Sequence, residues 1–549
     1  MIKESDNFIT ISTGQGRIKG IHKISNLGRL YLSFQGIPYM KAPIGKLRYR
    51  DPEPAGKWTN VFDATNEPPS YCFYHTETSF KGGQEDAGVL NIYIPKTSSS
   101  TLLPVMVYIY GGGFQMGSSR TDFYGPDYFM QKDVVLVTFN YRQGPIGFLS
   151  LKDTALGVPG NAGLKDQLLA LKWIKEEIEA FGGDPNNVTL FGDSAGGAMT
   201  HFHMISYQSE NLFQKAIIMS GCAFNKTWSL VSQKDFPQRL GKKLGWDGNG
   251  GEKKLLELLE HADIYEIMKN SAATQILTNE EFSEFLYFAF TPVIEPYITK
   301  TTFIDKDPIL MAREAWSKNI DCIIGGTSFE GAFSTIFERK SKFIEVFEDA
   351  SYFTPLIELG LKIMDEDTLR YGTRIKKIYF EYAHLTNTNY ELFCQYSTDR
   401  LFWHGLQNCV KSRVASDGKG KTFLYRFDVD TKLNVLKQYN KCDNLTGAIH
   451  GDTIFYLFSS IYLDPPEISS KEYEMITKMI SLWTNFATTG NPNNPNNPKE
   501  QDWVHISNVK YPLNCLNISG KQIEMISLPE SDRLMIWDTI YKDAKVQMF

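Results

Sequence analysis

The sequence predicts an α/β fold built on a large, mostly parallel central sheet that is flanked by helices. From about residue 90 onward, short apolar runs alternate with segments of helical periodicity, which is typical of a parallel sheet. The runs are apolar throughout and do not alternate with polar residues, which indicates strands that are covered on both faces. With 42% hydrophobic and 22% charged residues, the composition is that of a folded globular protein.

Six apolar runs are the predicted core strands: Val105–Tyr110, Val134–Tyr141, Val188–Phe191, Ala216–Met219, Cys322–Ile324 and Phe423–Phe427. Between the second and third runs, residues 162–181 place apolar side chains at helical spacing opposite Lys and Glu, which predicts an amphipathic helix. This helix should end at the sequence Gly182-Gly183-Asp184-Pro185, because glycine caps a helix and proline cannot continue it.

The whole chain, residues 1–549, is predicted to form a single domain. The stretch from about 230 to 400 is rich in helical patterns and is expected to form a cap over the carboxyl edge of the sheet. The segment Asn491–Glu500 (NPNNPNNPKE) is interpreted as a surface loop, with a domain linker as the alternative.

Charge and composition exclude several classes of protein. A net charge of −6 does not favour nucleic-acid binding. No window reaches 18 consecutive apolar residues, so no transmembrane segment is expected. The N-terminal residues lack the apolar core of a signal peptide, which favours a cytoplasmic protein, or a secreted one if a signal peptide has been removed. Four N-x-S/T sequons, at Asn187, Asn225, Asn444 and Asn517, carry little weight without such a signal.

A candidate nucleophile lies in the sequence Gly192-Asp193-Ser194-Ala195-Gly196, which matches G-x-S-x-G. An apolar run enters this motif and a helical pattern from Ala195 to Ile205 leaves it, as a strand–turn–helix elbow requires. The flanking glycines fit because the tight turn brings the helix close to the strand. Ser194 is therefore the predicted nucleophile.

A glycine-rich loop upstream can supply the oxyanion hole that an attacking serine needs. Tyr110-Gly111-Gly112-Gly113-Phe114 directly follows the first predicted core strand. Together with Ala195, Gly112 and Gly113 can provide three backbone N–H donors. A phosphate-binding loop is the alternative, but no helix with G-K-[ST] follows.

The acid and the base should follow the serine in the chain. The late histidines are His404, His450 and His505. His450 is favoured because it lies in a glycine-flanked loop just before an apolar segment, and Glu330 is the candidate acid because it follows the strand Cys322–Ile324.

The remaining polar groups predict no cofactor and no metal. His201 and His203 look like a metal pair, but they are two residues apart on a predicted helix, so they face different ways and are interpreted as structural. The seven cysteines form no C-x-x-C pair and are expected to be mostly free buried thiols.

Longer motifs are spread over nearly the whole chain. They are FQGIPYMKAPIGKLRYRDPEPAGKW (Phe34–Trp58), QEDAGVLNIY (Gln84–Tyr93), NYRQGPIGFLS (Asn140–Ser150), PGNAGLKDQ (Pro159–Gln167), FGGDPNNVTLFGDSAGG (Phe181–Gly197), FYLF (Phe455–Phe458) and LWTNFATTGNPN (Leu482–Asn493). In these motifs the sequence resembles the type-B carboxylesterase/cholinesterase family of α/β-hydrolases. STDRLFWHG (Ser397–Gly405) looks most like the insect alpha-esterase branch.

The resemblance implies an α/β-hydrolase fold with helical insertions over an active-site gorge. The catalytic triad of the family falls on Ser194, Glu330 and His450, and its oxyanion donors fall on Gly112, Gly113 and Ala195. The resemblance also implies buried structural ion pairs between Arg48 and Glu85 and between Arg142 and Asp166.

Departures from the family pattern limit which members of the family this chain can resemble in function. Ala87 stands where the family has a cysteine, so Cys72 has lost its usual disulfide partner, which favours an intracellular branch. No Trp lies between Phe73 and Asp86, which argues against acetylcholinesterase activity. Trp228 aligns loosely with an acyl-pocket Trp of related esterases, and a role in the core is the equal alternative.

The sequence therefore predicts a serine carboxylesterase that hydrolyses carboxylic esters through an acyl-enzyme on Ser194. Its expected substrates are small hydrophobic esters, as in the detoxification of xenobiotics, and organophosphates are expected covalent inhibitors. One alternative is an esterase of slow turnover that mainly sequesters esters or organophosphates. The other is a non-catalytic binding homologue.

Overall fold

The computed structural model describes residues 7–75, 80–230, 235–273, 277–286, 288–335, 340–494 and 502–549. Among these residues, 13 strands form one mixed sheet in the order β1-β2-β3-β7-β9-β8-β10-β11-β12-β13-β14-β15, with β4 beside β2. The strands from β9 to β14 are parallel to one another, and antiparallel strands extend the sheet at both ends. The predicted α/β fold with a mostly parallel central sheet is thereby confirmed.

The strands of this sheet are β1 (Phe8–Ser12), β2 (Arg17–Ile24), β3 (Leu30–Pro38), β4 (Phe62–Asp63), β7 (Val89–Pro95), β8 (Leu103–Ile109), β9 (Val135–Phe139), β10 (Gly183–Asp193), β11 (Lys215–Met219), β12 (Asp321–Thr327), β13 (Thr422–Asp428), β14 (Asn514–Ser519) and β15 (Ile523–Ser527). A separate hairpin pairs β5 (Phe73–His75) with β6 (Phe80–Gly82). Each of the six predicted core runs is a strand, and every residue of β7, β8, β9 and β11 is buried.

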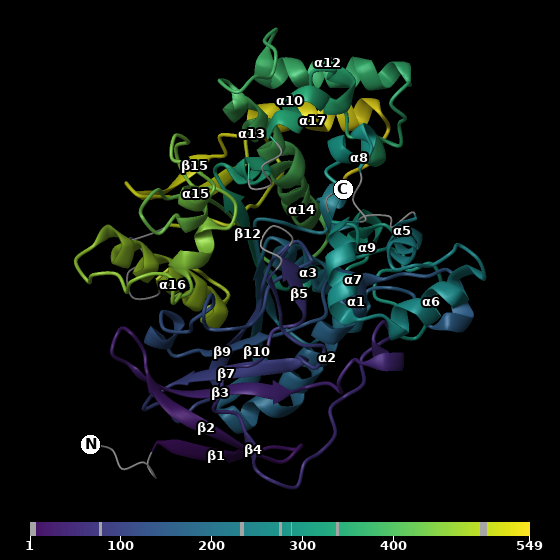
Figure 1. The fold of residues 1–549 in the computed structure, drawn as a ribbon. Helices are drawn as coiled ribbons and strands as arrows, with labels where there is room; N and C mark the ends of the chain where they lie inside the picture. Colours follow the sequence, from purple (N-terminus) through teal and green to yellow (C-terminus); the bar gives the residue numbers. More distant parts are fainter. Residues whose placement is uncertain are drawn as a thin grey trace.

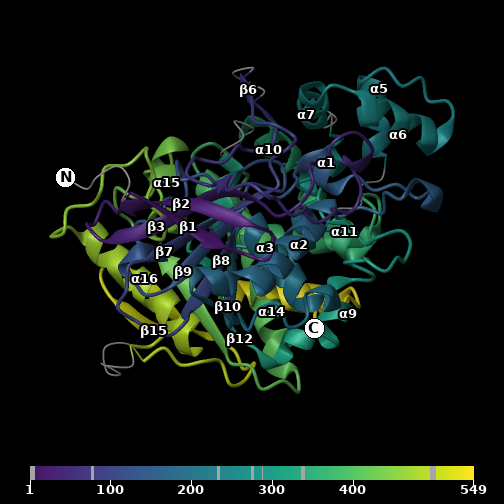
Figure 2. The same ribbon diagram turned by 90° about the horizontal axis from the view of Figure 1, so that it is seen from below.

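The α-helices are α1 (Gly144–Phe148), α2 (Ala162–Glu177), α3 (Ala195–Ile205), α4 (Lys226–Ser229), α5 (Phe236–Lys243), α6 (Gly251–His261), α7 (Ile264–Ala273), α8 (Asn279–Ser283), α9 (Pro308–Arg313), α10 (Lys340–Val346), α11 (Leu356–Leu359), α12 (Glu366–Phe380), α13 (Tyr390–Thr398), α14 (His404–Ala415), α15 (Val435–Tyr439), α16 (Lys471–Thr489) and α17 (Ser531–Asp543). Viewed from below, α16 lies on one side of strands β8 to β10, and α2 and α3 lie on the other (Figure 2).

The predicted amphipathic helix is present as α2, followed by a 3-10 turn over Ile178–Phe181. Gly182 adopts a left-handed conformation with φ of 79° and ends this turn. Strand β10 starts at the very next residue, Gly183, although the sequence favoured a break that continued to Pro185. The pairing of β10 with β8 shifts register between Gly183 and Val188, because Pro185 has no N–H group to give to a ladder.

Helices dominate the part of the chain between β11 and β13. Figure 1 shows α8, α10, α12 and α13 at the end of the molecule opposite to β1, β2 and β3, and α17 from the C-terminus lies among them. The division into a single domain with a helix-rich cap at about 230–400 stays a prediction.

Two implied ion pairs are present in the structure. Arg142 and Asp166 are fully buried and approach to 2.6 Å, and Arg48 lies 2.7 Å from Glu85 in a nearly buried position. All seven cysteines are buried, as expected, and Cys72 is a free thiol.

Two further expectations concern membrane-spanning helices and the predicted surface loop. Within the described ranges, no helix combines the length and the apolar character that crossing a membrane requires. Of the predicted loop Asn491–Glu500, residues 495–500 lie outside the described residues.

Candidate active site

Ser194 lies in the turn between β10 and α3. Its backbone has φ of 59° and ψ of −123°, a strained conformation for a residue with a side chain. Its N–H donates to the carbonyl of Met219 at 2.9 Å, which ties the turn to the neighbouring strand β11. A Cβ atom on Gly196 would lie 2.0 Å from the carbonyl oxygen of Ile109, and one on Gly192 would lie 2.4 Å from the oxygen of Gly196. Only glycine fits at these two positions, so the motif builds the elbow.

The structure brings Ser194, His450 and Glu330 together in one chain of polar contacts. Nε2 of His450 lies 2.8 Å from Oγ of Ser194, and Nδ1 lies 2.5 Å from Oε2 of Glu330. Oε1 of Glu330 accepts the N–H of Thr327 at 2.6 Å, which fixes the carboxylate at the end of β12. Glu330 is fully buried and His450 is 6% exposed, so the three groups interact in a medium of low polarity.

The loops that carry Glu330 and His450 are joined directly. The N–H of Phe329 donates to the carbonyl of Ala448 at 2.9 Å, and the N–H of Ala448 donates to Oγ of Ser328 at 3.0 Å. Asp452 closes the histidine loop from the other side, since its carboxylate accepts the N–H of Ile449 at 2.9 Å. These bonds determine where the imidazole points.

Charges around the imidazole set its protonation. Burial, the largest single influence, lowers the pKa of His450, but the charge and the hydrogen bond of Glu330 and the charges of Asp193 and Asp452 together outweigh burial, so the pKa lies above its ordinary value. Asp193, which precedes the serine, also lies close: burial raises the pKa of Asp193 to about 7, the charge of His450 lowers it and the charge of Glu330 raises it. Sequence reasoning missed Asp193, because the G-x-S-x-G pattern leaves this position open.

The glycine-rich segment Tyr110–Gly117, called the oxyanion loop below, lies beside Ser194. A Cβ on Gly111 would be 2.9 Å from Cβ of Ser194. Gly112 and Gly113 follow with φ of 106° and 61°, in the left-handed region that glycine tolerates. Ala195 is the first residue of α3, and an N–H at that position has no acceptor within its helix. Three backbone donors can thus face one oxyanion next to the serine.

An apolar wall borders the same serine. A Cβ on Gly221 would lie 2.7 Å from the carbonyl oxygen of Ser194 and 2.7 Å from the indole ring of Trp228. The ring of Phe402 lies 5.7 Å from that indole and 4.7 Å from the imidazole of His450, between ring centres. Trp228 is therefore buried and packs against Phe402, which lies next to His450; its role in an acyl pocket stays a prediction.

A π-helical turn, η10 (Asp399–Trp403), holds this wall in place. The carbonyl of Leu401 accepts the indole N–H of Trp228 at 2.7 Å. The carbonyl of Phe402 accepts Nδ2 of Asn225 at 3.0 Å. Because this amide is buried and bonded, the sequon at Asn225 is closed to glycosylation in the folded protein. No pattern in the sequence predicts η10, although π-helical turns are frequent at functional sites.

His201, His203 and His404 lie apart from the contacts that join Ser194, His450 and Glu330. His203 is buried between Ser209 and Gln167, and burial lowers its pKa to about 3. His201 accepts the N–H of Ala223 at 3.2 Å, so both have structural partners, as the sequence predicted. Nε2 of His404 lies 3.1 Å from Asp538, far along the chain from Glu330.

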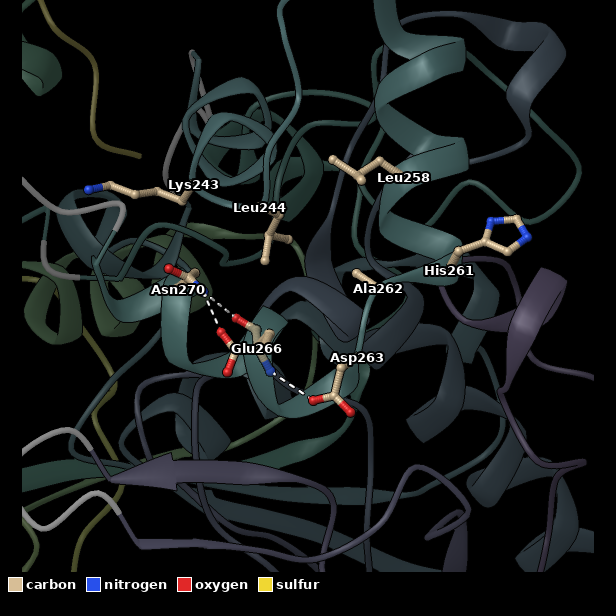
Figure 3. Close-up of a pocket in the computed structure, with 8 residues that line it drawn as sticks. All are labelled: Lys243, Leu244, Leu258, His261, Ala262, Asp263, Glu266 and Asn270. Carbon is tan, nitrogen blue, oxygen red and sulfur yellow. Dashed lines mark hydrogen bonds between the residues drawn. The ribbon is translucent and has the colours of Figure 1, made fainter.

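A hollow of about 390 Å³ lies among α5, α6 and α7 (Figure 3). Its lining residues are Lys243, Leu244, Leu258, His261, Ala262, Asp263, Glu266 and Asn270. The polar groups serve the local helix: Asp263 accepts the backbone N–H of Glu266, and Asn270 donates to Glu266. None of these residues belongs to the site around Ser194. Among the described residues, no group of three or more His, Cys, Asp or Glu side chains is placed to hold a metal ion.

The chain is similar to known esterases over most of its length. The model of the carboxylesterase family matches residues 5–537. Esterase B1 of Culex pipiens is 38% identical over 536 residues, which cover 97% of this chain and 98% of that protein. Juvenile hormone esterase of Tribolium castaneum is 33% identical over 510 residues, which cover 88% of this chain and 84% of that protein.

A solved structure shows the same fold. The crystal structure of juvenile hormone esterase from Manduca sexta, with OTFP covalently attached, has a TM-score of 0.84 and 29% sequence identity. The match covers 97% of this chain and 100% of that one. The expected α/β-hydrolase fold is confirmed, and so is the resemblance to the type-B carboxylesterase/cholinesterase family. The chain belongs to the carboxylesterase family and is a carboxylic-ester hydrolase.

Proposed function

We propose that the protein is a serine carboxylesterase that cleaves hydrophobic carboxylic esters through an acyl-enzyme on Ser194. The observation that carries the proposal is the continuous contact from Oγ of Ser194 through the imidazole of His450 to the buried carboxylate of Glu330. A serine that contacts a histidine, which in turn contacts a carboxylate, is the arrangement that activates an alcohol as a nucleophile.

In the first half of the reaction, Oγ of Ser194 attacks the ester carbonyl while Nε2 of His450 accepts its proton. The carbonyl oxygen becomes an oxyanion, which accepts hydrogen bonds from the N–H groups of Gly112, Gly113 and Ala195. Collapse of this intermediate breaks the bond to the alcohol oxygen, and His450 returns the proton to that oxygen. An alcohol leaves, and the acyl group remains on the serine.

In the second half, a water molecule replaces the alcohol. His450 accepts a proton from the water as the water attacks the acyl carbonyl, and then protonates Oγ of Ser194 as the carboxylic acid departs. Glu330 keeps Nδ1 of His450 protonated and stabilises the positive imidazolium in both halves. No metal or cofactor takes part in this scheme.

The surroundings of Ser194 support an apolar substrate. Phe402 lies against the imidazole of His450 and Trp228 lies against Phe402, so we expect one side of the ester to contact these aromatic rings. We assign Trp228 to the wall that limits the size of this group. Organophosphates should react at the same oxygen and block it, since a phosphoryl group replaces the acyl group there.

The test is steady-state hydrolysis of naphthyl esters from acetate to octanoate, with the pre-steady-state burst recorded, for the parent protein and Ser194→Ala. Ser220→Ala is a matched control, because Ser220 is also a buried serine with a positive φ, and its Oγ has no hydrogen-bond partner within the described part of the chain. Turnover that Ser194→Ala abolishes and Ser220→Ala retains supports the proposal. A burst of one equivalent followed by almost no turnover would indicate the sequestering alternative, and equal activity of Ser194→Ala would refute the acyl-enzyme.

A further inference from the structure

The oxyanion loop adopts a conformation that needs support from outside. Gly112, Gly113 and Phe114 have φ of 106°, 61° and 64° in succession. A left-handed backbone is unfavourable for Phe114, which has a side chain, and such conformations persist only where the surrounding structure fixes them. The position of the N–H groups of Gly112 and Gly113 therefore depends on whatever holds the ends of this loop.

Both ends of the loop are held by one buried amide. Nε2 of Gln143 donates to Oη of Tyr110 at 2.7 Å and to the carbonyl oxygen of Gly117 at 3.1 Å. Tyr110 begins the loop and Gly117 ends it, and a Cβ on Gly117 would lie only 2.6 Å from the ring of Tyr110. Gln143 is 2% exposed, so water does not compete for these bonds.

The neighbours of Gln143 support the same loop. The N–H of Gly144 donates to the carbonyl of Phe114 at 2.6 Å, in the middle of the loop. Oη of Tyr141 donates to the carbonyl of Tyr110 at 2.8 Å. The segment from 141 to 144 thus runs along the oxyanion loop and bonds to its start, its middle and its end.

This supporting segment is itself fixed in the core. The N–H of Arg142 donates to the carboxylate of Asp166 at 3.0 Å, and the guanidinium donates to the same carboxylate at 2.6 Å and 2.8 Å. Because Arg142 and Asp166 are fully buried, Gln143 is attached to a rigid base. The amide of Gln143 can therefore hold the oxyanion loop in one position.

We infer that Gln143 is a positioning residue of the oxyanion hole: its amide holds the two ends of the oxyanion loop together and thereby places the N–H groups of Gly112 and Gly113. The inference rests on the proposed acyl-enzyme mechanism and adds to it a residue that does not touch the substrate. The carbonyl oxygen of Gly117 requires a donor, because a carbonyl can only accept a hydrogen bond, and the hydroxyl of Tyr110 accepts from the same Nε2. A carboxylate would present oxygen to the carbonyl of Gly117, and an aliphatic side chain would leave that carbonyl without its bond.

The experiment compares Gln143→Leu, Gln143→Glu and Tyr110→Phe with the parent protein. The readouts are kcat and KM for naphthyl butyrate and the inhibition constant of an alkyl trifluoromethyl ketone, which forms a hemiketal with the serine and places an oxyanion in the hole. For Gln143→Leu and Gln143→Glu, kcat should fall by about 10- to 100-fold, less than the roughly 100- to 1,000-fold effect of losing a donor itself. KM should change little, and ketone inhibition should weaken in parallel with kcat/KM. Tyr110→Phe should lose less, because the bond to Gly117 remains.

Gln407→Leu is the matched control, because Gln407 is also fully buried and its amide donates to Tyr511, outside the oxyanion loop. Unchanged kcat and ketone inhibition in folded Gln143→Leu would overturn the inference, and so would equal losses in Gln407→Leu. If Gln143→Leu fails to fold, Gln143→Glu and Tyr110→Phe decide by the same readouts. Failure of the proposed function is distinct, because Ser194→Ala would then remain active.

Discussion

Replacing the buried Asp193 by Asn should stabilise the folded protein at neutral and alkaline pH. Asp193 is 4% exposed, and its Oδ1 has no hydrogen-bond partner among the residues that the structure describes. Burial, its largest influence, raises the pKa of Asp193 to about 7, against about 3.9 in an unfolded chain. Its contribution to stability is therefore present below about pH 4 and is lost as the pH rises through about 7. The difference of about 3 pH units corresponds to about 4 kcal/mol in the free energy of unfolding.

The assay is thermal unfolding of the parent protein and Asp193→Asn at a fixed scan rate between pH 4 and pH 9. Unfolding entropy is about 2.1 cal/mol/K per residue, so for 549 residues 4 kcal/mol corresponds to a Tm difference of about 3 to 4 °C. The Tm difference between Asp193→Asn and the parent protein should increase from pH 4 to pH 7 and stay constant at higher pH. Asp464→Asn removes an exposed carboxylate, so its Tm difference from the parent protein should not change with pH.

The result that would refute this reasoning is a Tm difference that stays the same, or shrinks, between pH 4 and pH 8. The same variant has a second readout. Where Asp193 is ionised, near and above pH 7, its negative charge favours protonated His450, so kcat/KM of Asp193→Asn should reach its plateau at a lower pH than that of the parent protein. If Asp193→Asn both stabilises the folded protein and changes the pH dependence of activity, then the Asp193 carboxylate serves catalysis at the expense of stability.

Three further predictions concern the triad, the pocket and the core. Glu330→Gln should lower kcat by about 10⁴-fold and move the acid limb of the pH–rate profile to lower pH, because Glu330 raises the pKa of His450; an unmoved limb would contradict this. Trp228→Leu should raise the ratio of kcat/KM for octanoate over acetate by about tenfold, measured on the naphthyl esters, and a ratio that falls would exclude the indole as the limiting wall. Arg142→Met should lower the free energy of unfolding in urea by about 3–5 kcal/mol, since Asp166 is left buried without its partner. The double variant with Asp166→Leu should recover part of that loss, and purely additive losses would argue against the pairing.

The fold and the nucleophile could be predicted from the sequence because their signals are local. The core strands are continuous apolar runs, and the elbow around Ser194 needs glycine at Gly192 and Gly196, where any Cβ would meet backbone atoms. The acid and the base depend on contacts between distant segments. Chemistry alone left several histidines open, and the bonds of Ala448 with Phe329 and Ser328 show why the loop of His450 lies beside Glu330.

The polar groups around the triad could not be predicted, because their roles depend on what packs against them. Asp193 and Gln143 occupy positions that no pattern constrains, and each is defined by burial and by partners from other segments. The wall at Trp228 has the same origin. Its indole N–H bonds to Leu401, which is 173 residues away in the chain.

The order of the strands has a consequence for the folding of the chain during its synthesis on the ribosome. From β8 onward the sheet runs β8, β10, β11, β12, β13, β14, so it can grow at one edge in the order in which the strands are synthesised. Ser194 and His450 are 256 residues apart, which at about 5–20 residues per second is a delay of tens of seconds. During that interval the nascent chain carries the nucleophile without its base. It should neither cleave esters nor be trapped by phosphorylating agents until the segment that carries His450 has also emerged.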